Sequence, residues 1–494
     1  MEIISHKNID SKDASAYFDL GVLLGKQNRY GEAEVAYRKA IEITPNFTQA
    51  YSNLGGLLVK LNRFEEAEAT YRKVIEIDPN LAQTYNNLGS LLNGQNRSKE
   101  AEAAYRKAFE IDPKNVRAHF NLGGLLVKLN RFEEAEATYR KAIEIDPNLA
   151  QAYFNLGVLL VKRNRFKEAE AVYRRAIEVD PKNAQAYNNL GGLLDDQNRS
   201  EEAEVAYRKV IEIDPKYATA HFNLGGLLDD QNRFKEAEAV YRRAIEIDPK
   251  FFQAYYNLGV LLDDQNRFKE AEATYRKAVE IDPKDAETVY NLGVLLGKQK
   301  RFEEAETAFR KVIEIDPKYA QAYSNLGLQL DKVNRSEEAE AAFRKVIEID
   351  PKDAQNYSNW GGLLVKQNRS EEAEAAFRKA IELDPKYATA HFNLGVLLVK
   401  LNRSEEAEAA FRKAIELDPK YATAHFNLGE LLVKLNQFKE AEAAYHRAIE
   451  LDPKYAIAHL NLGELLVKLN RFEEAEAAYR RAIELDRKNS FDSI

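Results

Sequence analysis

Residues 48–81 read TQAYSNLGGLLVKLNRFEEAEATYRKVIEIDPNL, and this stretch decides the fold. In its first half, apolar residues recur at i, i+3, i+6 and i+7: Tyr51, Leu54, Leu57 and Leu58. That spacing places all four side chains on one face of an α-helix and predicts a helix with a single apolar stripe.

A break and a second helix follow. Asn62 tolerates the left-handed conformation that ends a helix. The second helix is expected from about Glu65 to Glu76, and it stops at Asp78 because the residue before Pro79 is pushed out of the helical region. Where a serine precedes the acidic first turn, we expect it to be the N-cap of the second helix; the serines are Ser98, Ser200, Ser336, Ser370 and Ser404.

The same unit recurs along the chain of 494 residues. All thirteen prolines follow one another at steps of 34 residues: Pro45, Pro79, Pro113, Pro147, Pro181, Pro215, Pro249, Pro283, Pro317, Pro351, Pro385, Pro419 and Pro453. Fourteen copies therefore cover 476 residues without insertion or deletion, between a lead-in at 1–13 and a tail at 490–494. The copies are 14–47, 48–81, 82–115, 116–149, 150–183, 184–217, 218–251, 252–285, 286–319, 320–353, 354–387, 388–421, 422–455 and 456–489.

Three positions of the copy explain how its helices pack. Position 8 is always glycine, position 20 is always alanine, and position 24 is always tyrosine or phenylalanine. Glycine inside a helix costs about 1 kcal/mol relative to alanine, so fourteen such glycines need a cause. Close approach of the two helices, with the aromatic ring beside them, is that cause. One pair cannot bury its faces alone, so the copies are expected to stack into an all-α solenoid.

The pattern aromatic-x-x-Leu-Gly, then Ala at 20, Tyr or Phe at 24 and Pro at 32 resembles the tetratricopeptide repeat. The copies also resemble the repeat array of O-linked N-acetylglucosamine transferase, whose catalytic domain has no counterpart here. The resemblance implies a right-handed superhelix whose first helices line a concave groove.

Composition excludes several classes of protein. The chain has no cysteine, which rules out disulfides, thiolate zinc sites and iron–sulfur clusters. The net charge of −8 is unlike the basic surface of a nucleic-acid binder. No apolar stretch resembles a signal peptide or a membrane span, so we expect a soluble, cytoplasmic protein without nucleic-acid or membrane partners.

The face expected to line the groove carries one repeated polar residue. Position 6 is asparagine in every copy but the first, which has Asp19. A row of side-chain amides, each with a donor and an acceptor, can hold an extended peptide by its backbone, as the matching asparagines of the transferase array imply by resemblance. We call this row the asparagine ladder: Asn53, Asn87, Asn121, Asn155, Asn189, Asn223, Asn257, Asn291, Asn325, Asn359, Asn393, Asn427 and Asn461. The alternative is that these amides only hydrogen-bond a neighbouring helix.

Charge on the same helices varies between copies. Position 13 is lysine in ten copies, including Lys128, Lys162, Lys298 and Lys366. Copies six to eight carry acidic pairs instead: Asp195 and Asp196, Asp229 and Asp230, and Asp263 and Asp264. These residues either select the charge of a partner or are solvated helix ends that drifted together. A calcium site would need converging oxygens from a loop, and no metal is expected.

Aromatic side chains at position 5 have two open interpretations: they receive apolar side chains of a partner, or they pack on the neighbouring repeat. They are Phe120, Phe154, Phe222, Tyr256, Tyr290, Phe392 and Phe426.

No catalytic constellation is apparent. Five histidines occupy position 4, where most other copies have tyrosine, and are expected to be substitutes in an aromatic core slot: His119, His221, His391, His425 and His459. Trp360 replaces the leucine of position 7 and is expected in the core. We expect neither enzymatic activity nor a cofactor.

The leading hypothesis is a protein-interaction scaffold that holds an extended peptide or flexible segment of a partner. Two alternatives stay open: a targeting arm of a glycosyltransferase or other enzyme encoded elsewhere, and a self-assembling solenoid. The last copy has Asp486-Arg487 where Asp-Pro is expected and no obvious capping helix after it, which suggests end-to-end self-association or a fragment.

Overall fold

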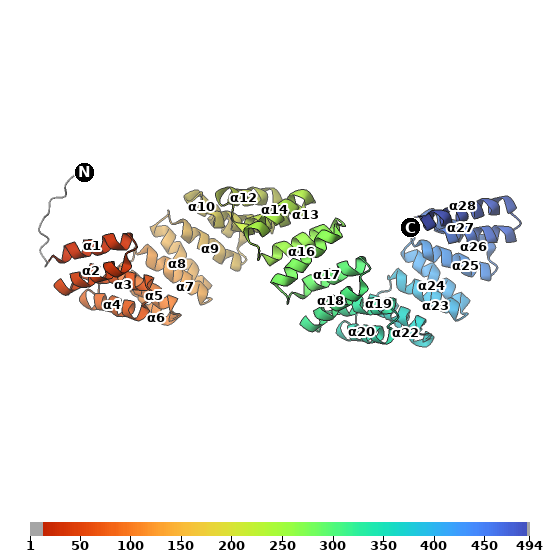
Figure 1. Cartoon of the computed structure of the whole chain (residues 1–494), viewed down its shortest axis with the longest axis horizontal. Coiled ribbons are helices and arrows are strands. Elements are labelled where there is room, and N and C mark those ends of the chain that lie inside the picture. Colours follow the sequence, from red (N-terminus) through yellow and green to blue (C-terminus); the bar gives the residue numbers. More distant parts are fainter. Residues whose placement is uncertain (1–12, 492–494) are drawn as a thin grey trace. The chain divides into compact units, whose positions relative to one another are not determined.

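The computed structural model describes residues 13–491, and side chains as far as Asp486. In this part of the chain there are 28 α-helices and no strands (Figure 1). They fall into two compact units, Met1–Pro249 with α1 to α14 and Lys250–Ile494 with α15 to α28. Residues 1–12 of the expected lead-in at 1–13 and residues 492–494 of the expected tail lie outside the described residues.

The helices of the first unit are α1 (Ala14–Lys26), α2 (Tyr30–Ile43), α3 (Thr48–Lys60), α4 (Phe64–Ile77), α5 (Ala82–Gly94), α6 (Ser98–Ile111), α7 (Val116–Lys128), α8 (Phe132–Ile145), α9 (Ala150–Lys162), α10 (Phe166–Val179), α11 (Ala184–Asp195), α12 (Ser200–Ile213), α13 (Ala218–Asp230) and α14 (Phe234–Ile247).

Those of the second unit are α15 (Phe252–Asp264), α16 (Phe268–Ile281), α17 (Ala286–Lys298), α18 (Phe302–Ile315), α19 (Ala320–Lys332), α20 (Ser336–Ile349), α21 (Ala354–Lys366), α22 (Ser370–Leu383), α23 (Ala388–Lys400), α24 (Ser404–Leu417), α25 (Ala422–Lys434), α26 (Phe438–Leu451), α27 (Ala456–Lys468) and α28 (Phe472–Phe491).

Each 34-residue copy contains one odd-numbered first helix and one even-numbered second helix. Within each unit, a first helix packs on the second helix of its own copy and on the second helix of the preceding copy. In the second copy, for example, Leu54, Leu58, Ala67 and Tyr71 are all at most 3% exposed. The core is therefore a continuous layer between helices, as stacking of incomplete repeats requires.

The expected close approach of the two helices is confirmed. A Cβ atom added to Gly55 would lie 2.6 Å from Cε1 of Tyr71, and each of the fourteen position-8 glycines meets the position-24 ring of its own copy within 3.0 Å in the same way. Real Cβ atoms do not approach other atoms so closely, so the aromatic ring occupies the space that a side chain would need. This explains glycine in the middle of every first helix.

The turn between the helices is also as expected. Asn62 has φ of 57°, and the residue at position 15 has positive φ in all fourteen copies. Thirteen of these residues are asparagine, and the exception is Lys300 with φ of 62°. Lysine has no side-chain amide to satisfy the backbone in this conformation, so the turn at Lys300 carries a conformational cost that the other turns lack.

The assignment of serine as the N-cap of the second helix is wrong. Ser98 and its counterparts are the first helical residues, and the arginine before each of them is the N-cap without a side-chain capping bond. The arginine binds a carboxylate in the first turn instead: Nε and Nη2 of Arg97 lie 2.8 and 2.7 Å from the carboxylate oxygens of Glu100.

The proline at position 32 ends the second helix of each copy, and the last copy, which lacks this proline, has a longer second helix. The other second helices have 14 residues, whereas α28 has 20 and continues through Arg487, which stands at the proline position. The backbone of residues 490 and 491, expected in a tail, therefore belongs to this helix.

The position-4 histidines fill aromatic slots beside the preceding turn. Nε2 of His119 lies 3.1 Å from the carbonyl oxygen of Pro113, and His221 makes the same contact with Pro215 at 3.2 Å. Burial lowers the pKa of His119 and His221 more than these carbonyl contacts raise it, so both rings are held in the neutral form. Trp360 is half-buried and packs against the core of the second unit.

We predict that Lys300→Asn stabilises the second unit by about 1 kcal/mol, because asparagine tolerates positive φ better than lysine. The reciprocal change Asn334→Lys in the next copy should destabilise it by a similar amount. Urea denaturation followed by circular dichroism measures both variants. If both changes leave the unfolding midpoint where it is in the parent chain, the turn conformation does not contribute to stability.

Candidate peptide-binding face

The candidate face consists of positions 2, 6, 9 and 13 of the first helices. Its asparagine ladder is accessible: Asn53 is exposed and the other twelve amides are half-buried. The two helices of each copy are held by the packing of positions 8 and 24, so the ladder is displayed from a rigid element rather than from a loop.

Six of the ladder amides bridge successive copies: Asn461 donates to Oε1 of Glu430 at 3.1 Å, and the other five share one pattern. Their Nδ2 donates to the side chain at position 5 of the preceding copy, 35 residues earlier in the chain. The pairs are Asn121 with Oδ1 of Asn86 at 3.0 Å, Asn223 with Oδ1 of Asn188 at 3.2 Å, Asn291 with the hydroxyl of Tyr256 at 3.2 Å, Asn325 with the hydroxyl of Tyr290 at 2.9 Å, and Asn393 with Oγ of Ser358 at 3.2 Å. Asn121 also donates to Oγ of Ser90 at 3.3 Å, whereas each of the other four amides keeps a second N–H group and a carbonyl oxygen for another partner.

The remaining amides depend on their surroundings. Where position 5 of the preceding copy is phenylalanine, the bridge has no acceptor. Asn155 then accepts a hydrogen bond from Nε2 of Gln151 at 3.1 Å, and Asn427 donates to the carbonyl oxygen of Thr423 at 2.8 Å. Nδ2 of Asn359 is buried and has no hydrogen-bond partner among the described residues. The structure thus shows a structural role for part of the ladder, while peptide clamping stays a prediction.

The position-5 aromatics pack inside the repeat array. Phe120 lies against Tyr139 with ring centroids 6.0 Å apart, and Phe426 contacts both Tyr445 and Tyr455 at 5.9 and 5.1 Å. These are rings of positions 24 and 34 of the same copy. The rings are therefore held by intramolecular packing, in a tilted geometry that aromatic pairs favour.

The hydroxyl groups of the position-24 tyrosines point toward the candidate face. A Cβ atom added at Gly56 would lie 3.8 Å from the hydroxyl oxygen of Tyr71, and Gly124 stands in the same relation to Tyr139 at 3.7 Å. Burial raises the pKa of both tyrosines to about 12, so they stay protonated donors at neutral pH.

The charged rows differ in how far they are neutralised within the chain. Nζ of Lys298 lies 2.9 Å from Asp263, and Nζ of Lys366 lies 2.7 Å from Asp331. Lys128 donates to Oδ1 of Asn96 at 2.8 Å. The two ion pairs neutralise lysines that the sequence analysis expected to select the charge of a partner.

In copies six and seven of the first unit, the carboxylates of Asp195, Asp196 and Asp230 repel one another. Burial raises the pKa of Asp195, and the nearby carboxylates of Asp230 and Asp196 raise it further. The three carboxylates therefore lie close enough to repel one another, which a cationic group of a partner would relieve.

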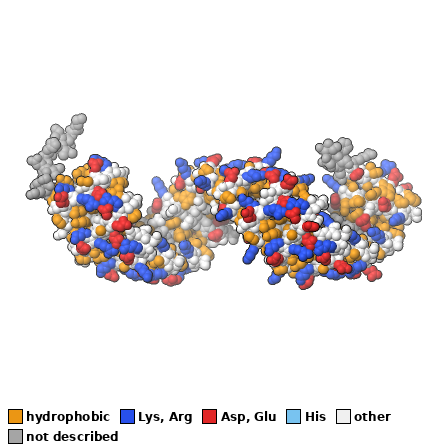
Figure 2. Space-filling model, turned by 60° about the horizontal axis from the view of Figure 1, so that its bottom comes forward, with side chains coloured by type: hydrophobic (Ala, Val, Ile, Leu, Met, Phe, Trp, Pro, Cys, Tyr) orange, Lys and Arg blue, Asp and Glu red, His pale blue; other side chains and the backbone are white. Residues whose placement is uncertain are grey.

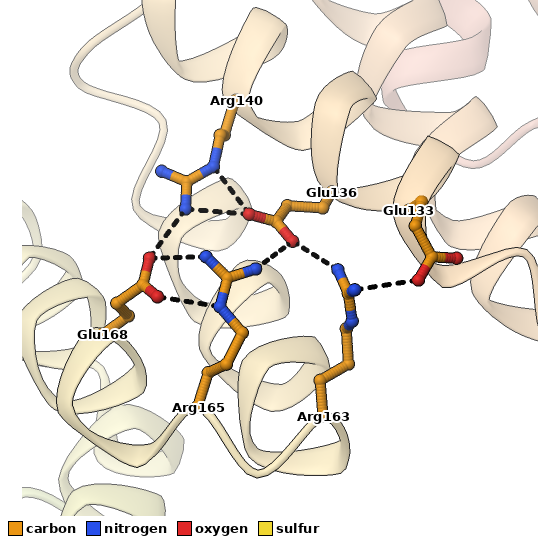
Figure 3. A network of polar contacts seen from close by, with 6 residues as sticks. All are labelled: Glu133, Glu136, Arg140, Arg163, Arg165 and Glu168. Carbon is orange, nitrogen blue, oxygen red and sulfur yellow. Dashed lines mark hydrogen bonds and ion pairs between the residues drawn. The ribbon is translucent and has the colours of Figure 1, made fainter.

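The second helices carry an ion-pair network that spans successive copies. Figure 3 shows one example, in which Glu136 receives three guanidinium groups. Its carboxylate lies 2.9 Å from Arg140 of its own copy, and 2.7 and 2.5 Å from Arg163 and Arg165 of the next copy. Burial raises the pKa of Glu136, but the hydrogen bonds from Arg140 and Arg165 outweigh it and lower the pKa below its usual value.

The arginine of position 16, which only the thirteenth copy replaces with Gln437, repeats this bridge within each unit. Arg63 contacts Glu34 at 2.7 Å, Arg97 contacts Glu68 at 2.6 Å, and Arg301 contacts Glu272 at 2.6 Å. The sequence predicts only the i,i+4 pairs within one helix, such as Arg72 with Glu68. The bridging pairs are 29 residues apart in the chain and appear only when copies are stacked. On the face shown in Figure 2, acidic and basic side chains are correspondingly interspersed.

Helix pairs of 34 residues stacked in this way define a repeat protein of the α-solenoid class. The model of the C-terminal domain of cilia and flagella-associated protein 70, a tetratricopeptide-repeat model, matches residues 77–292 and 183–391. Tetratricopeptide repeat models match residues 26–88, 388–421 and 426–490. The chain belongs to the tetratricopeptide repeat family, whose members are scaffolds for protein–protein interaction.

Similar solved structures were also found. The chain is similar to the APC/C hetero-tetramer Cut9–Hcn1, with 14% identity over 92% of this chain and 96% of that chain and a TM-score of 0.42. It is similar to yeast Tom70, with 19% identity over 94% of this chain and 96% of that chain and a TM-score of 0.38. YrrB, a TPR protein with an unusual peptide-binding site, is 27% identical over 40% of this chain and 98% of its own, with a TM-score of 0.34. A search of curated protein sequences found no match.

Two further properties concern the described residues alone. No helix among them is both long and apolar enough to cross a membrane. No three histidine or acidic side chains in the described part of the chain are grouped so that they could hold a metal ion.

We predict that Glu136→Gln lowers the free energy of unfolding by about 2 kcal/mol, because a neutral amide cannot compensate three guanidinium groups around a largely buried site. Glu133→Gln is the matched control, since Glu133 has a side chain 77% exposed and contacts only Arg163. Its cost should be under about 0.5 kcal/mol. Urea denaturation measures both, and equal losses would contradict the bridging role of Glu136.

Proposed function

We propose that the chain is an interaction scaffold that holds an extended segment of a partner protein along the first helices, with the asparagine ladder as its backbone clamp. The observation that carries the proposal is the accessibility of the ladder together with its spare hydrogen-bonding capacity. Asn223 and Asn325, for example, each use one N–H group in the bridge between copies and leave an N–H group and a carbonyl oxygen unused there.

The geometry of stacked helices suits an extended peptide. Neighbouring packed helices lie about 10 Å apart, and an extended chain advances about 10 Å in three residues. One ladder amide per copy can therefore meet the backbone of a partner every third residue. Such bonds are independent of the partner's side chains, so they supply affinity without sequence selectivity.

Charge supplies the selectivity in this proposal. In the first unit, the position-13 row begins with Lys26 and Lys60, continues with Lys128 and Lys162, and ends with the aspartates of copies six and seven. A partner with acidic residues toward the first copies and basic residues toward the last would match this row. In the second unit, the pairs of Lys298 with Asp263 and Lys366 with Asp331 leave a less polarised face.

We predict that removing ladder amides that make no bridge between copies weakens peptide binding without changing the stability of the chain. Peptides selected from a random phage-displayed library against the intact chain provide the probes, and fluorescence polarisation measures their affinity. The triple variant Asn53→Ala, Asn155→Ala and Asn189→Ala removes amides that follow a phenylalanine at position 5 and make no bridge to it. We expect affinity to fall about tenfold or more, with an unchanged melting temperature.

Two matched variants complete this test. Asn121→Ala with Asn223→Ala removes two bridges and should lower the free energy of unfolding by about 1–2 kcal/mol as well as weakening binding. Thr70→Ala with Thr138→Ala changes second helices of the same unit and should leave affinity intact. Selected peptides that bind the triple variant as tightly as the intact chain would show that the ladder is structural only.

Self-association is a second candidate, favoured by the outer faces of the terminal copies. Leu20 and Leu23 are 44% and 53% exposed, whereas their counterparts Leu54 and Leu57 are 3% and 6% exposed. The last copy likewise exposes Ile483, at 55%. These faces would be covered if the last repeat of one molecule stacked on the first repeat of a second molecule. Light scattering over a concentration series should then show a mass that rises with concentration, and a monomer throughout would reject this candidate.

A further inference from the structure

Histidine is concentrated in the last three copies of the array. Of the seven histidines in the chain, four lie within residues 388–489: His391, His425, His446 and His459. His425 and His459 stand at position 4 of the thirteenth and fourteenth copies, where eight other copies have tyrosine. Because the ordinary pKa of histidine lies near neutral pH, these two copies can respond to mild acid in a way that the tyrosine copies cannot.

The ring of His425 is half-buried in the thirteenth copy. Its Nε2 lies 3.3 Å from the carbonyl oxygen of Pro419. Since a carbonyl oxygen only accepts, Nε2 carries the hydrogen, and Nδ1 is the atom that a further proton would occupy. Burial lowers the pKa of His425 more than its bond to Pro419 raises it, and Arg447 lowers this pKa while Asp418 raises it. Protonation would therefore place a second cation beside Arg447 in a half-buried site.

The other charged groups around His425 are already paired. The ring lines a hollow of about 480 Å³ formed by side chains of α24, α25 and α26. Each carboxylate of this neighbourhood is bound by a cation, so an imidazolium would compete with an existing ion pair. These pairs are Arg412 with Glu440 at 2.5 Å, Lys413 with Glu416 at 2.7 Å, and Arg447 with Glu450 at 2.8 Å.

His459 has equivalent surroundings in the last copy, where its ring is half-buried beside the carbonyl of Pro453. Burial lowers the pKa of His459 more than Pro453 raises it, and Arg481 of α28 and His446 of α26 lower it further. Protonation of His459 would add a cation next to Arg481, and next to a second one once His446 is protonated. These neighbours lie close to carboxylates of their own helices: Arg481 is 2.7 Å from Glu484, and His446 is 3.8 Å from Glu442.

The last two copies are also attached by fewer ion pairs. A typical junction within a unit has two bridges, as Arg63 with Glu34 and Arg38 with Glu66. They use the arginines of positions 16 and 25, and the thirteenth copy has neither, since Gln437 and His446 stand there. Each of the last two junctions therefore keeps one of these bridges, Arg412 with Glu440 and Arg471 with Glu442. Opening of this end breaks fewer bonds than opening elsewhere in the array.

We propose that the last two copies form an acid-sensitive end of the array, which opens when His425 and His459 take up protons. Above about pH 6.5 both rings are neutral whether the copies are folded or open. Below that pH, open copies bind protons that the folded copies resist, so the stability of this end falls as the pH falls. Carboxylates do not account for a change in this range, because their ordinary pKa is about 4.

Acid opening would regulate the function proposed above, and this consequence alone rests on that function. Asn427 and Asn461 are the ladder amides of the last two copies, and an open end no longer presents them to a partner. A segment held along the second unit would therefore be released more readily in mild acid. Opening is measured without a ligand, so a failure of the ladder as a clamp would leave the acid-sensitive end intact.

Hydrogen exchange of the full chain, followed by mass spectrometry, measures the opening of each helix as a protection factor corrected for the pH dependence of intrinsic exchange. Between pH 7.5 and 5.5 we expect the protection of α25 to α28 to fall about tenfold or more. Each histidine can contribute up to about tenfold at one pH unit below its ordinary pKa. Helices α15 to α22, whose copies contain no histidine, should keep their protection.

Three variants assign the response to the two rings. His425→Tyr with His459→Tyr gives both copies the residue that other copies carry, and it should remove the acid response. His119→Tyr with His221→Tyr makes the same exchange in the first unit and should leave the response of α25 to α28 as in the parent chain. Gln437→Arg should raise the protection of the last copies by the same factor at both pH values, because arginine does not titrate there.

An acid response that persists in His425→Tyr with His459→Tyr would overturn the proposal, as would an equal loss of protection in α15 to α22. If that variant is less protected than the parent chain at pH 7.5, NMR titration of the imidazole signals of the parent chain decides. We expect His425 and His459 to titrate below their ordinary pKa, together with the loss of protection. Titration of both rings near pH 6.5 without opening would contradict the acid-sensitive end.

Discussion

The contact between the position-8 glycine and the position-24 aromatic ring is the constraint on which the rest of the structure depends. At Gly55 the ring of Tyr71 occupies the space of a Cβ atom, and the same holds in every copy. The ring thereby sets the separation and orientation of the two helices in each copy. Because the contact does not vary, successive copies present their first helices in the same way.

Two consequences follow on opposite sides of the helix pair. The first helices present a row of asparagines, with an invariant glycine at position 8 and a variable residue at position 5. The second helices present arginines and glutamates that meet across copies, as Arg97 meets Glu68. Exposed ion pairs are weak individually, but Glu136 and most of its counterparts are largely buried, and within each unit they bind an arginine of the next copy. Burial and ion pairing therefore act on the same interface.

Much of this could be predicted from sequence, because the repeat places each residue in fourteen equivalent environments. The helix pairs, the glycine contact and the left-handed turn at Asn62 all follow from local rules applied to one copy. The bonds between copies do not, since Asn121 and Asn86 become neighbours only through stacking. The serine caps were misassigned because Arg97, and not Ser98, is the N-cap, although its side chain binds Glu100 and makes no capping bond.

The most direct measurement of the central constraint compares two neighbouring glycines in one helix. A Cβ atom at Gly123 would lie 2.6 Å from Cε1 of Tyr139, whereas one at Gly124 would lie 3.7 Å from its hydroxyl oxygen. Hydrogen exchange of α7 and α8, with thermal unfolding, should show Gly123→Ala less protected and less stable than the parent chain. Gly124→Ala should be stabilised by up to about 1 kcal/mol, as expected for alanine in a helix. If both variants gain stability equally, the contact between positions 8 and 24 does not hold the helix pair together.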